Sequence, residues 1–229
     1  MSYQFDFGPA FGSVRYLIRG AGLTLVIAFV SFWLGAVIGL LGALGKTRGG
    51  ASLRRAIDGY VVFMTNTPAL VQVYFIFYGL PSVGITLAPL TAVLIGLVLN
   101  SGAYLTEIIR AGVLSVPKSE LEATEAIGLT RLQSVRYVVI PHVLRTVYGP
   151  LVNFFVLLVL GSSMAALFGV EELTGRAINI STTNLRTIET FIIVALIYVA
   201  LTLCAQLALT AAGRRSLYRA RPAKRSAYV

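Results

Sequence analysis

The chain has 229 residues, of which 57% are hydrophobic and only 12% are charged, and its mean hydropathy is +0.83. A soluble core does not need so many apolar residues, so this composition favours a membrane protein. The net charge of +10 does not indicate a nucleic-acid-binding protein, because the basic residues lie beside apolar stretches and form no long basic run.

The opening residues, MSYQFDFGPAFGSVRY, lack a basic region followed by a cleavable apolar stretch, so we expect no signal peptide. Four tracts without any charged residue follow, each at or above the roughly 20 residues that a spanning helix needs. They are Gly20–Gly45, Gly59–Thr106, Thr146–Val170 and Thr190–Gly213. The second is long enough for two spans and is interrupted at 79–84, which reads Gly-Leu-Pro-Ser-Val-Gly. The sequence therefore predicts one all-α transmembrane domain over 1–229, with five helices at about 16–45, 57–79, 87–111, 144–169 and 189–212.

The basic residues predict the orientation, because Lys and Arg near the ends of spans are retained on the cytoplasmic side. With the N-terminus outside, fifteen of the nineteen basic residues fall in the inner segments. These are Lys46, Arg48, Arg54, Arg55, Arg110, Lys118, Arg131, Arg136, Arg145, Arg214, Arg215, Arg219, Arg221, Lys224 and Arg225. The C-terminus is therefore expected in the cytoplasm.

Glycines in the first span predict close helix packing. Gly35 and Gly39 form a G-x-x-x-G pattern, which lets two helices approach closely. Gly45-Lys46-Thr47 resembles the end of a phosphate-binding loop, but that loop needs glycine where this chain has Leu40. We therefore expect the chain not to bind ATP itself.

Residues suited to catalysis or metal binding are scarce. His142 is the one histidine and has no HExxH pattern around it, so a solvated or capping residue is the expected role. Cys204 is the one cysteine, which excludes an intrachain disulfide, and we expect a small buried hydrophobic residue. Glu107 is the one clear acid inside a predicted span, and it is expected to pair with Arg110 three residues later. No catalytic and no metal site is predicted.

A polar, helix-forming island at 117–141 lies between the third and fourth spans, within an expected loop at 115–141. Its first helix is predicted to begin with a capping box, Ser119-x-x-Glu122. Gly128 supplies the left-handed position that ends a helix at little steric cost.

A second short helix follows in the island. Thr130 and Gln133 form a T-x-x-Q capping box at its start, and the helix is predicted to run until Pro141. The predicted order is thus helix, glycine turn, helix.

The first island helix carries small or apolar residues beside Glu120, Glu122 and Glu125. A helix of about two turns is marginal alone in water and needs a partner surface. Helix-in-groove docking on a protein is one interpretation. The alternative, an amphipathic helix lying on the membrane, is disfavoured because three glutamates would face an anionic leaflet.

Several motifs together resemble a known family. Glu122-Ala123-Thr124, then Gly128, then Val138-Val139-Ile140-Pro141 after nine residues, resembles the E-A-A-x-x-x-G-x9-I-x-L-P loop of bacterial ABC importer permeases, with mild replacements by Thr, Val and Ile. The motifs Gly22–Leu25, Asn66–Gln72, Gly102–Gly112 and Gly169–Leu173 are similar to those of the polar amino-acid permeases, which serve histidine, glutamine, arginine and glutamate importers.

The resemblance implies a type I ABC importer permease fold with five spans in the bacterial inner membrane. It implies pairing with an identical or homologous second permease, docking of two ATPase subunits that carry ATP and Mg²⁺, and delivery of substrate by an extracytoplasmic binding protein. The island would then be the coupling loop, which lies in a cleft of the ATPase and moves when the ATPase dimer closes. The residues assigned to ATPase coupling are Glu122, Ala123, Thr124, Gly128 and Pro141. No cofactor is expected in this chain.

Polar residues inside spans are costly and often line a polar path, although many only join helices. The candidates for a substrate path are Asn66, Thr67, Gln72, Asn100, Ser101, Asn153, Ser162 and Ser163.

The chain departs from the family at two places. Many members carry Lys-Asp-Thr-Ser where this chain has Leu160-Gly161-Ser162-Ser163, and Arg-Gly-Thr-Pro where it has Thr65-Asn66-Thr67-Pro68. The counter-charges for an amino acid are thereby lost, so we expect either a partner subunit that supplies them or an incomplete site in this chain.

A self-sufficient secondary carrier or channel is the rival interpretation. Such a protein usually shows internal repeats and intramembrane acids, and the sequence has no evident repeat. A membrane enzyme is a weaker alternative, because no paired acid and base groups are present.

Overall fold

The computed structural model describes residues 4–217, and every regular element in that range is helical. The elements are α1 Gly8–Gly12, α2 Val14–Arg48, α3 Ala51–Asn66, α4 Ala69–Tyr74, the π-helical turn η1 Phe75–Gly79, the 3₁₀ turn η2 Leu80–Val83, α5 Pro89–Leu114, α6 Lys118–Ala126, α7 Arg131–Ser134, the π-helical turn η3 Val135–Val139, α8 Ile140–Gly161, the 3₁₀ turn η4 Ser162–Phe168, α9 Leu173–Asn184 and α10 Thr187–Leu217.

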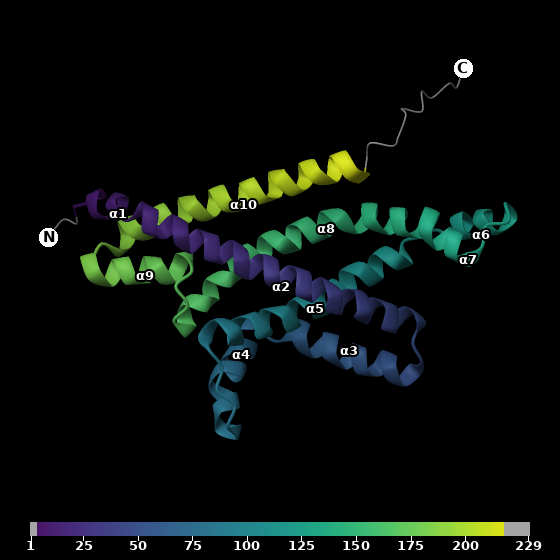
Figure 1. The fold of residues 1–229 in the computed structure, drawn as a ribbon, viewed down its shortest axis with the longest axis horizontal. Helices are drawn as coiled ribbons and strands as arrows, with labels where there is room; N and C mark the ends of the chain where they lie inside the picture. Colours follow the sequence, from purple (N-terminus) through teal and green to yellow (C-terminus); the bar gives the residue numbers. More distant parts are fainter. Residues whose placement is uncertain (1–3, 218–229) are drawn as a thin grey trace, which may run out of the picture.

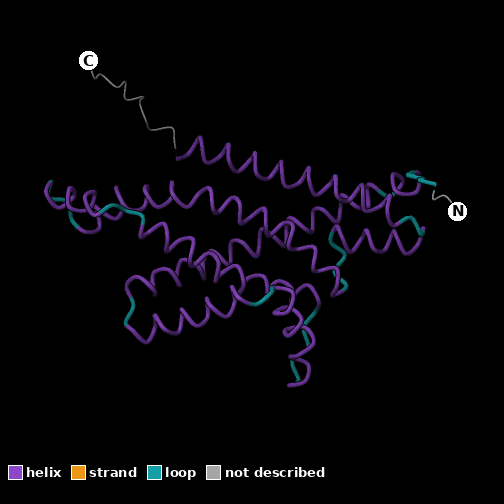
Figure 2. Tube along the Cα trace, turned by 180° about the vertical axis from the view of Figure 1, so that it is seen from behind, coloured by secondary structure: helices purple, strands orange, loops and turns teal. Residues whose placement is uncertain are grey.

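The helices form an elongated bundle (Figure 1). α1, α9 and the start of α10 lie at one end, while α6 and α7 extend from the other, where α5 ends and α8 begins. The view from behind shows the same arrangement, with the first described residues at one end of the bundle and the last helix stopping short of the other end (Figure 2). We call the end that carries α6 the coupling end. Arg219, Arg221, Lys224 and Arg225, which entered the orientation argument, lie outside the described residues.

Four helices among the described residues are long and apolar enough to cross a membrane: α2, α5, the continuous segment 131–168, and α10. A fifth span is possible if the pair Ala51–Asn66 and Ala69–Val83 counts as one, although the pair is bent by 102°. The all-helical membrane architecture is therefore confirmed, and the helix expected at 57–79 is interrupted between Asn66 and Ala69. Pro68 explains the break, because it lacks an N–H and keeps Thr67 extended, with φ −115° and ψ 140°.

The fourth span also differs from the prediction. We expected the island's second helix to end at Pro141 and a span to begin near residue 144. Instead one helical segment runs from α7 through η3 and α8 into η4. The π-helical turn at η3 directly precedes the proline, and such turns are one way a helix accommodates a local break in its hydrogen bonds.

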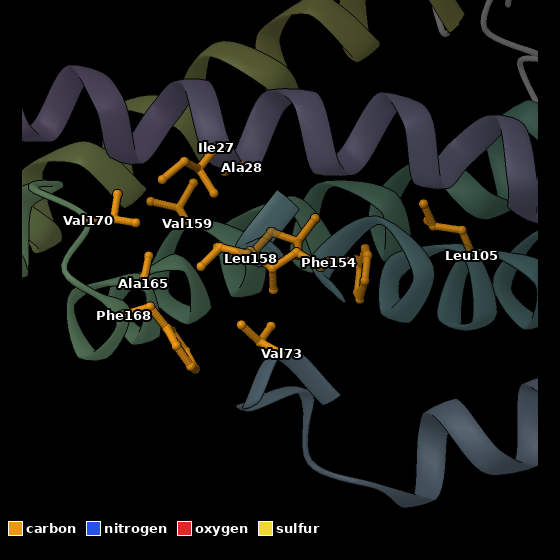
Figure 3. Close-up of a cluster of buried hydrophobic side chains, with 12 residues drawn as sticks. Ile27, Ala28, Val73, Leu105, Phe154, Leu158, Val159, Ala165, Phe168 and Val170 are labelled. Atoms are coloured by element: carbon orange, nitrogen blue, oxygen red, sulfur yellow. The ribbon is translucent and has the colours of Figure 1, made fainter. Parts of the chain in front are cut away.

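The core joins segments distant in sequence. Figure 3 shows Ile27 of α2, Val73 of α4, Leu105 of α5 and Phe154 of α8 among the buried side chains of one cluster. A second cluster, which includes Leu17 and Leu173, packs α2 against α9 and α10. Cys204, expected to be buried, is exposed on the isolated chain, because α10 presents much of its surface outward.

α2 and α5 pack at very short range through the predicted glycines. A Cβ added at Gly35 would lie 2.5 Å from Ser101 Cβ, and one added at Gly39 would lie 2.6 Å from Leu105 Cβ. Real Cβ atoms do not approach so closely, so only glycine permits this contact. The expected packing role of the G-x-x-x-G pattern is confirmed within the subunit.

Replacing Gly39 by valine is expected to destabilise the chain by about 1–3 kcal/mol, because overpacking forces α2 away from α5. The matched control is Gly22→Val on the same helix, where an added Cβ meets nothing within 4 Å. Thermal unfolding of both variants in one detergent measures the difference. Equal stabilities would contradict the close contact.

Candidate coupling loop and polar path

α6 begins directly after Pro117, whose extended backbone, with φ −63° and ψ 139°, is the N-cap. No side chain caps this end, so the predicted Ser119–Glu122 capping box is wrong. The helix starts at Lys118, which places Ser119 within the first turn instead of ahead of it. The second predicted box is confirmed: the Gln133 N–H donates to Thr130 Oγ1, and the Thr130 N–H donates to Gln133 Oε1 at 2.8 Å.

Gly128 ends α6 in the left-handed conformation, with φ +77°, as predicted. Its N–H donates to the Glu125 carbonyl, and the Leu129 N–H donates to the Thr124 carbonyl, both at 3.0 Å. This bond pair is a Schellman motif, which pairs carbonyls that a helix end leaves free. A Cβ at Gly128 would meet nothing within 4 Å, so backbone conformation alone favours glycine here.

Two polar contacts attach α6 to the segment that leads into α8. Thr124 is buried, and its hydroxyl donates to the Leu121 carbonyl and accepts from Ser134 Oγ at 2.8 Å. His142 Nδ1 lies 3.3 Å from Glu120 Oε2. His142 was expected to be solvated or capping, but it is only partly exposed and contacts α6. α6 is therefore anchored to the long fourth helix through side chains and not only through the connecting turn.

The opposite surface of α6 is open. Glu122, Ala123, Glu125 and Ala126 are exposed, and Ile127 is 74% exposed at the end of the helix. α6 and its C-cap therefore present carboxylates, small residues and two large apolar side chains, Leu121 and Ile127, to their surroundings. A helix of nine residues gains stability chiefly from packing, so this surface is suited to a partner.

A charged cluster joins three helices near the coupling end. Lys46 Nζ of α2 lies 2.6 Å from both Asp58 Oδ1 of α3 and Glu107 Oε1 of α5. Arg110 donates to Glu107 Oε2 through Nε at 2.9 Å and Nη2 at 2.7 Å, so the predicted pairing of these two residues is confirmed. The sequence analysis did not predict the ion pairs of Lys46 with Asp58 and Glu107, because the proximity of Lys46 and Asp58 depends on the turn between α2 and α3.

Three of the predicted path residues meet at the break between α3 and α4. Gln72 Nε2 donates to the Met64 carbonyl at 2.9 Å and to Thr67 Oγ1 at 2.7 Å. Asn100 Nδ2 donates to the same Met64 carbonyl at 3.1 Å and to Gln72 Oε1 at 3.2 Å. These amides therefore pair backbone groups that Pro68 leaves without helical partners.

The other predicted path residues lie apart. Asn66 is on the exposed side of α3 and donates to the Val62 carbonyl, and Ser162 is buried in η4 and donates to the Val159 carbonyl. Ser163 follows in η4, and Asn153 lies on α8 beside α10. Ser101 is buried with its hydroxyl unpaired within the described residues. The structure thus brings together one group of three and leaves the rest dispersed.

Glu172 is a buried acid that sequence reasoning missed. It is fully buried at the start of α9, where its Oε1 accepts from the Gly175 N–H at 2.9 Å. Its Oε2 accepts from Thr24 Oγ1 of α2 at 2.9 Å and from the Tyr198 hydroxyl of α10 at 3.0 Å. The sequence held no clear signal for this role, because glutamate is not one of the residues preferred at an N-cap. This carboxylate ties α2, α9 and α10 together.

No group of three or more His, Cys, Asp or Glu side chains within residues 4–217 is arranged to hold a metal ion. The described part of the site thus consists of a surface helix, charged clusters that join helices, and amides at a helix break.

This fold defines a polytopic helical membrane protein with a polar loop helix at one end. Residues 35–217 match the family model of the binding-protein-dependent transport system inner membrane component. The chain belongs to that family, which is the family of ABC importer permeases, and it is a multi-pass inner membrane protein. The expected type I importer permease fold is thereby confirmed, and the self-sufficient carrier or channel is not supported.

The chain is similar to named relatives. It is 38% identical over 196 residues to the "Probable amino-acid ABC transporter permease protein YckA" of Bacillus subtilis, covering 86% of this chain and 87% of the relative. It is 36% identical over 202 residues to the "Glutamine transport system permease protein GlnP" of Escherichia coli, covering 87% and 92%. A solved amino acid ABC transporter with histidines aligns at a TM-score of 0.87 and 31% identity, covering 93% of this chain and all of that one.

Replacing Glu172 by leucine is expected to lower the free energy of unfolding by several kcal/mol, because each unpaired buried donor costs about 1–3 kcal/mol. The control is Glu171→Leu at the neighbouring exposed position, for which a loss below about 1 kcal/mol is expected. Denaturation in detergent measures both. Similar losses in the two variants would contradict the three-helix role of Glu172.

Replacing Thr124 by valine removes the bond to Ser134 with little change in shape. Because one hydrogen bond contributes roughly 0.5–1.5 kcal/mol, amide hydrogen exchange in α6 should become about two- to tenfold faster. Thr124→Ser keeps the hydroxyl and should exchange near the original rate. Exchange in α6 that is the same in all three proteins would show that the bond does not hold the helix.

Proposed function

We propose that this chain is the membrane-spanning permease subunit of an ATP-driven importer for polar amino acids. The observation that carries the proposal is α6, an exposed acidic and apolar helix anchored to the long fourth helix, in a chain that belongs to the importer permeases. The amino-acid substrate class rests on relatives whose names state glutamine or amino-acid transport, and on the solved amino acid transporter.

In this proposal a separate ATPase pair docks at the coupling end and carries the ATP and Mg²⁺. Glu122, Ala123 and Gly128 belong to the surface that enters the ATPase groove, and the buried Thr124 holds that surface in place. Pro141 lies within the continuous helical segment 131–168. The hydrogen bond between Ser134 and Thr124 joins α6 to this segment, so motion of α6 passes into the fourth span. Closure of the ATPase dimer then switches the permease between inward-facing and outward-facing states.

The proposed orientation has α1 and α9 outside and the coupling end in the cytoplasm. It is supported by the separation of Arg15, Arg19, Arg176 and Arg186, which lie at the start of α2, on α9 and just before α10, from the described basic residues at the other ends of α2 and α10 and on α3, α6 and α7. An extracytoplasmic binding protein would deliver substrate at the α9 end, and a second permease, identical or homologous, would complete the path.

For the substrate path we propose that the cluster of Thr67, Gln72 and Asn100 lies at its edge. The three side chains already pair with one another or with backbone carbonyls, so they have limited capacity for a ligand. This supports the expectation that the second permease supplies charged groups for the ammonium and carboxylate of an amino acid.

Affinity purification of the full chain from its native membrane tests the central part of the proposal. An ATPase subunit with a phosphate-binding loop should co-purify, and ATP hydrolysis should require that subunit. Purification of the chain without an ATPase, but with transport activity, would instead support a self-sufficient carrier.

Gly128→Asp and Glu122→Lys are expected to reduce amino-acid uptake at least tenfold while membrane insertion stays normal. The first adds a charge and left-handed strain of about 1–2 kcal/mol, and the second reverses a charge on the proposed docking surface. Gly50→Asp is the matched control, because Gly50 has a negative φ of −67° and a Cβ added there would meet nothing within 4 Å. Normal uptake by both α6 variants would contradict docking at this surface.

A further inference from the structure

A groove between α8 and α10 contains Asn153, one of the predicted path residues that lie apart from the cluster at Pro68. It has a volume of about 380 Å³ and lies in the half of the bundle nearer the coupling end. Its lining consists of Tyr148, Gly149, Val152, Asn153, Gln206, Thr210 and Arg214.

The polar residues of the groove form a row along α10. Gln206, Thr210 and Arg214 are spaced by four, which places them on one face of the helix, and Asn153 lies on the facing helix. The row runs about 12 Å along the helix axis at 1.5 Å per residue. None of these four side chains makes a hydrogen bond with another residue in the range 4–217. The rest of α10 is strongly apolar, so this row is a distinct feature of the helix.

The groove is held in shape by its own walls. The Tyr148 hydroxyl donates to the Leu209 carbonyl at 2.5 Å, and the Tyr148 ring packs against Gly213, where any side chain would collide with it. Pro150 lies inside α8, so the helix lacks the N–H that would pair with the Thr146 carbonyl. Gly149 presents bare backbone to the groove.

The lining determines which occupant fits. It contains an arginine and neutral polar groups but no carboxylate, which favours an anionic group over a cation. A phospholipid would place its headgroup near Arg214 and leave Asn153 and Gln206 in contact with hydrocarbon. Unpaired polar groups in hydrocarbon are costly, so a small solute surrounded by water fits the whole row better.

We propose that the α8–α10 groove is the cytoplasmic half of the substrate path, a water-filled vestibule for a small polar solute that carries a carboxylate. Arg214 attracts the carboxylate at the inner mouth, while Asn153, Gln206 and Thr210 replace part of its hydration. A single arginine without further charged partners binds weakly, which suits release. This inference rests on the proposed function, because it assigns the inner end of that importer's path.

Cysteine reactivity in the assembled transporter tests the vestibule. Cys204 is the one cysteine of the chain, so Cys204→Ser gives a background without thiols in this subunit. Gln206→Cys then places a thiol in the groove, and Leu207→Cys places one at the same depth outside the lining, at a position 68% exposed. Both are treated in inside-out membrane vesicles with membrane-impermeant methanethiosulfonates, one anionic and one cationic, of similar size.

The groove position is expected to react at least ten times faster than the Leu207 position. The ratio of anionic to cationic reagent rates at Gln206→Cys should fall about threefold when Arg214→Gln is added, because a unit charge about 12 Å away in water changes the energies of the two reagents by roughly 0.35 kcal/mol each, in opposite directions. Equal amounts of the Gln206→Cys and Leu207→Cys chains in the purified transporter verify that both assemblies are intact.

Equal, slow reaction at both positions would overturn the proposal and would be the result expected if lipid fills the groove. An unchanged reagent ratio in Arg214→Gln would overturn the role of the arginine. The reaction rates of the cysteines do not depend on ATP hydrolysis. A failure of the proposed function would appear as the absence of a co-purifying ATPase, whereas a failure of the vestibule proposal would appear in these reaction rates.

Discussion

The bilayer offers no water to backbone or side-chain polar groups, and the rest of this structure depends on that constraint. Every regular element among the described residues is a helix, which pairs its own backbone groups. Where Pro68 interrupts a helix, Gln72 and Asn100 donate to the Met64 carbonyl. Where an acid is buried, as at Glu172, three donors surround it. At these two places a departure from a simple apolar helix is matched by specific polar partners.

The same constraint explains why the coupling end differs in character. α6 lies beyond the ends of α5 and α8, and Glu122 and Glu125 on it are exposed. Its hold on the bundle comes from buried hydroxyl groups and from the contact between Glu120 and His142. Because α7, η3 and α8 form one helical segment, a force on α6 has a direct mechanical route into the fourth span. The replacement of alanine by Thr124 in the E-A-A pattern thus has a local explanation, since the added hydroxyl pairs with Ser134.

Much of the fold could be predicted from the sequence because apolar tracts and glycine spacing are local signals. The tracts located the long helices, the G-x-x-x-G pattern indicated the close packing of α2, and Gly128 was predicted in its left-handed conformation. The break at Pro68 was missed, because that proline lies in the part of an uncharged tract before the interruption at 79–84, and this part reads as one helix.

The contacts that define the candidate site were less predictable. Thr124 with Ser134, and Glu172 with Thr24 and Tyr198, depend on how distant helices pack, and one sequence does not specify that packing. Ser119 was predicted as the N-cap, two residues beyond the true N-cap, which is Pro117 itself. The assignment of residues to coupling or to a substrate path remains a proposal, supported by family membership and by the exposure of α6.

Photo-crosslinking in intact cells tests the central claim, that α6 enters a separate ATPase, most directly. A photoreactive phenylalanine at Ala126 on the exposed side of α6 is compared with one at Thr182, an exposed position on α9 at the opposite end. The account predicts an adduct between Ala126 and an ATPase subunit, identified by mass spectrometry, and none from Thr182. An Ala126 adduct with lipid alone, or an ATPase adduct from Thr182, would contradict it.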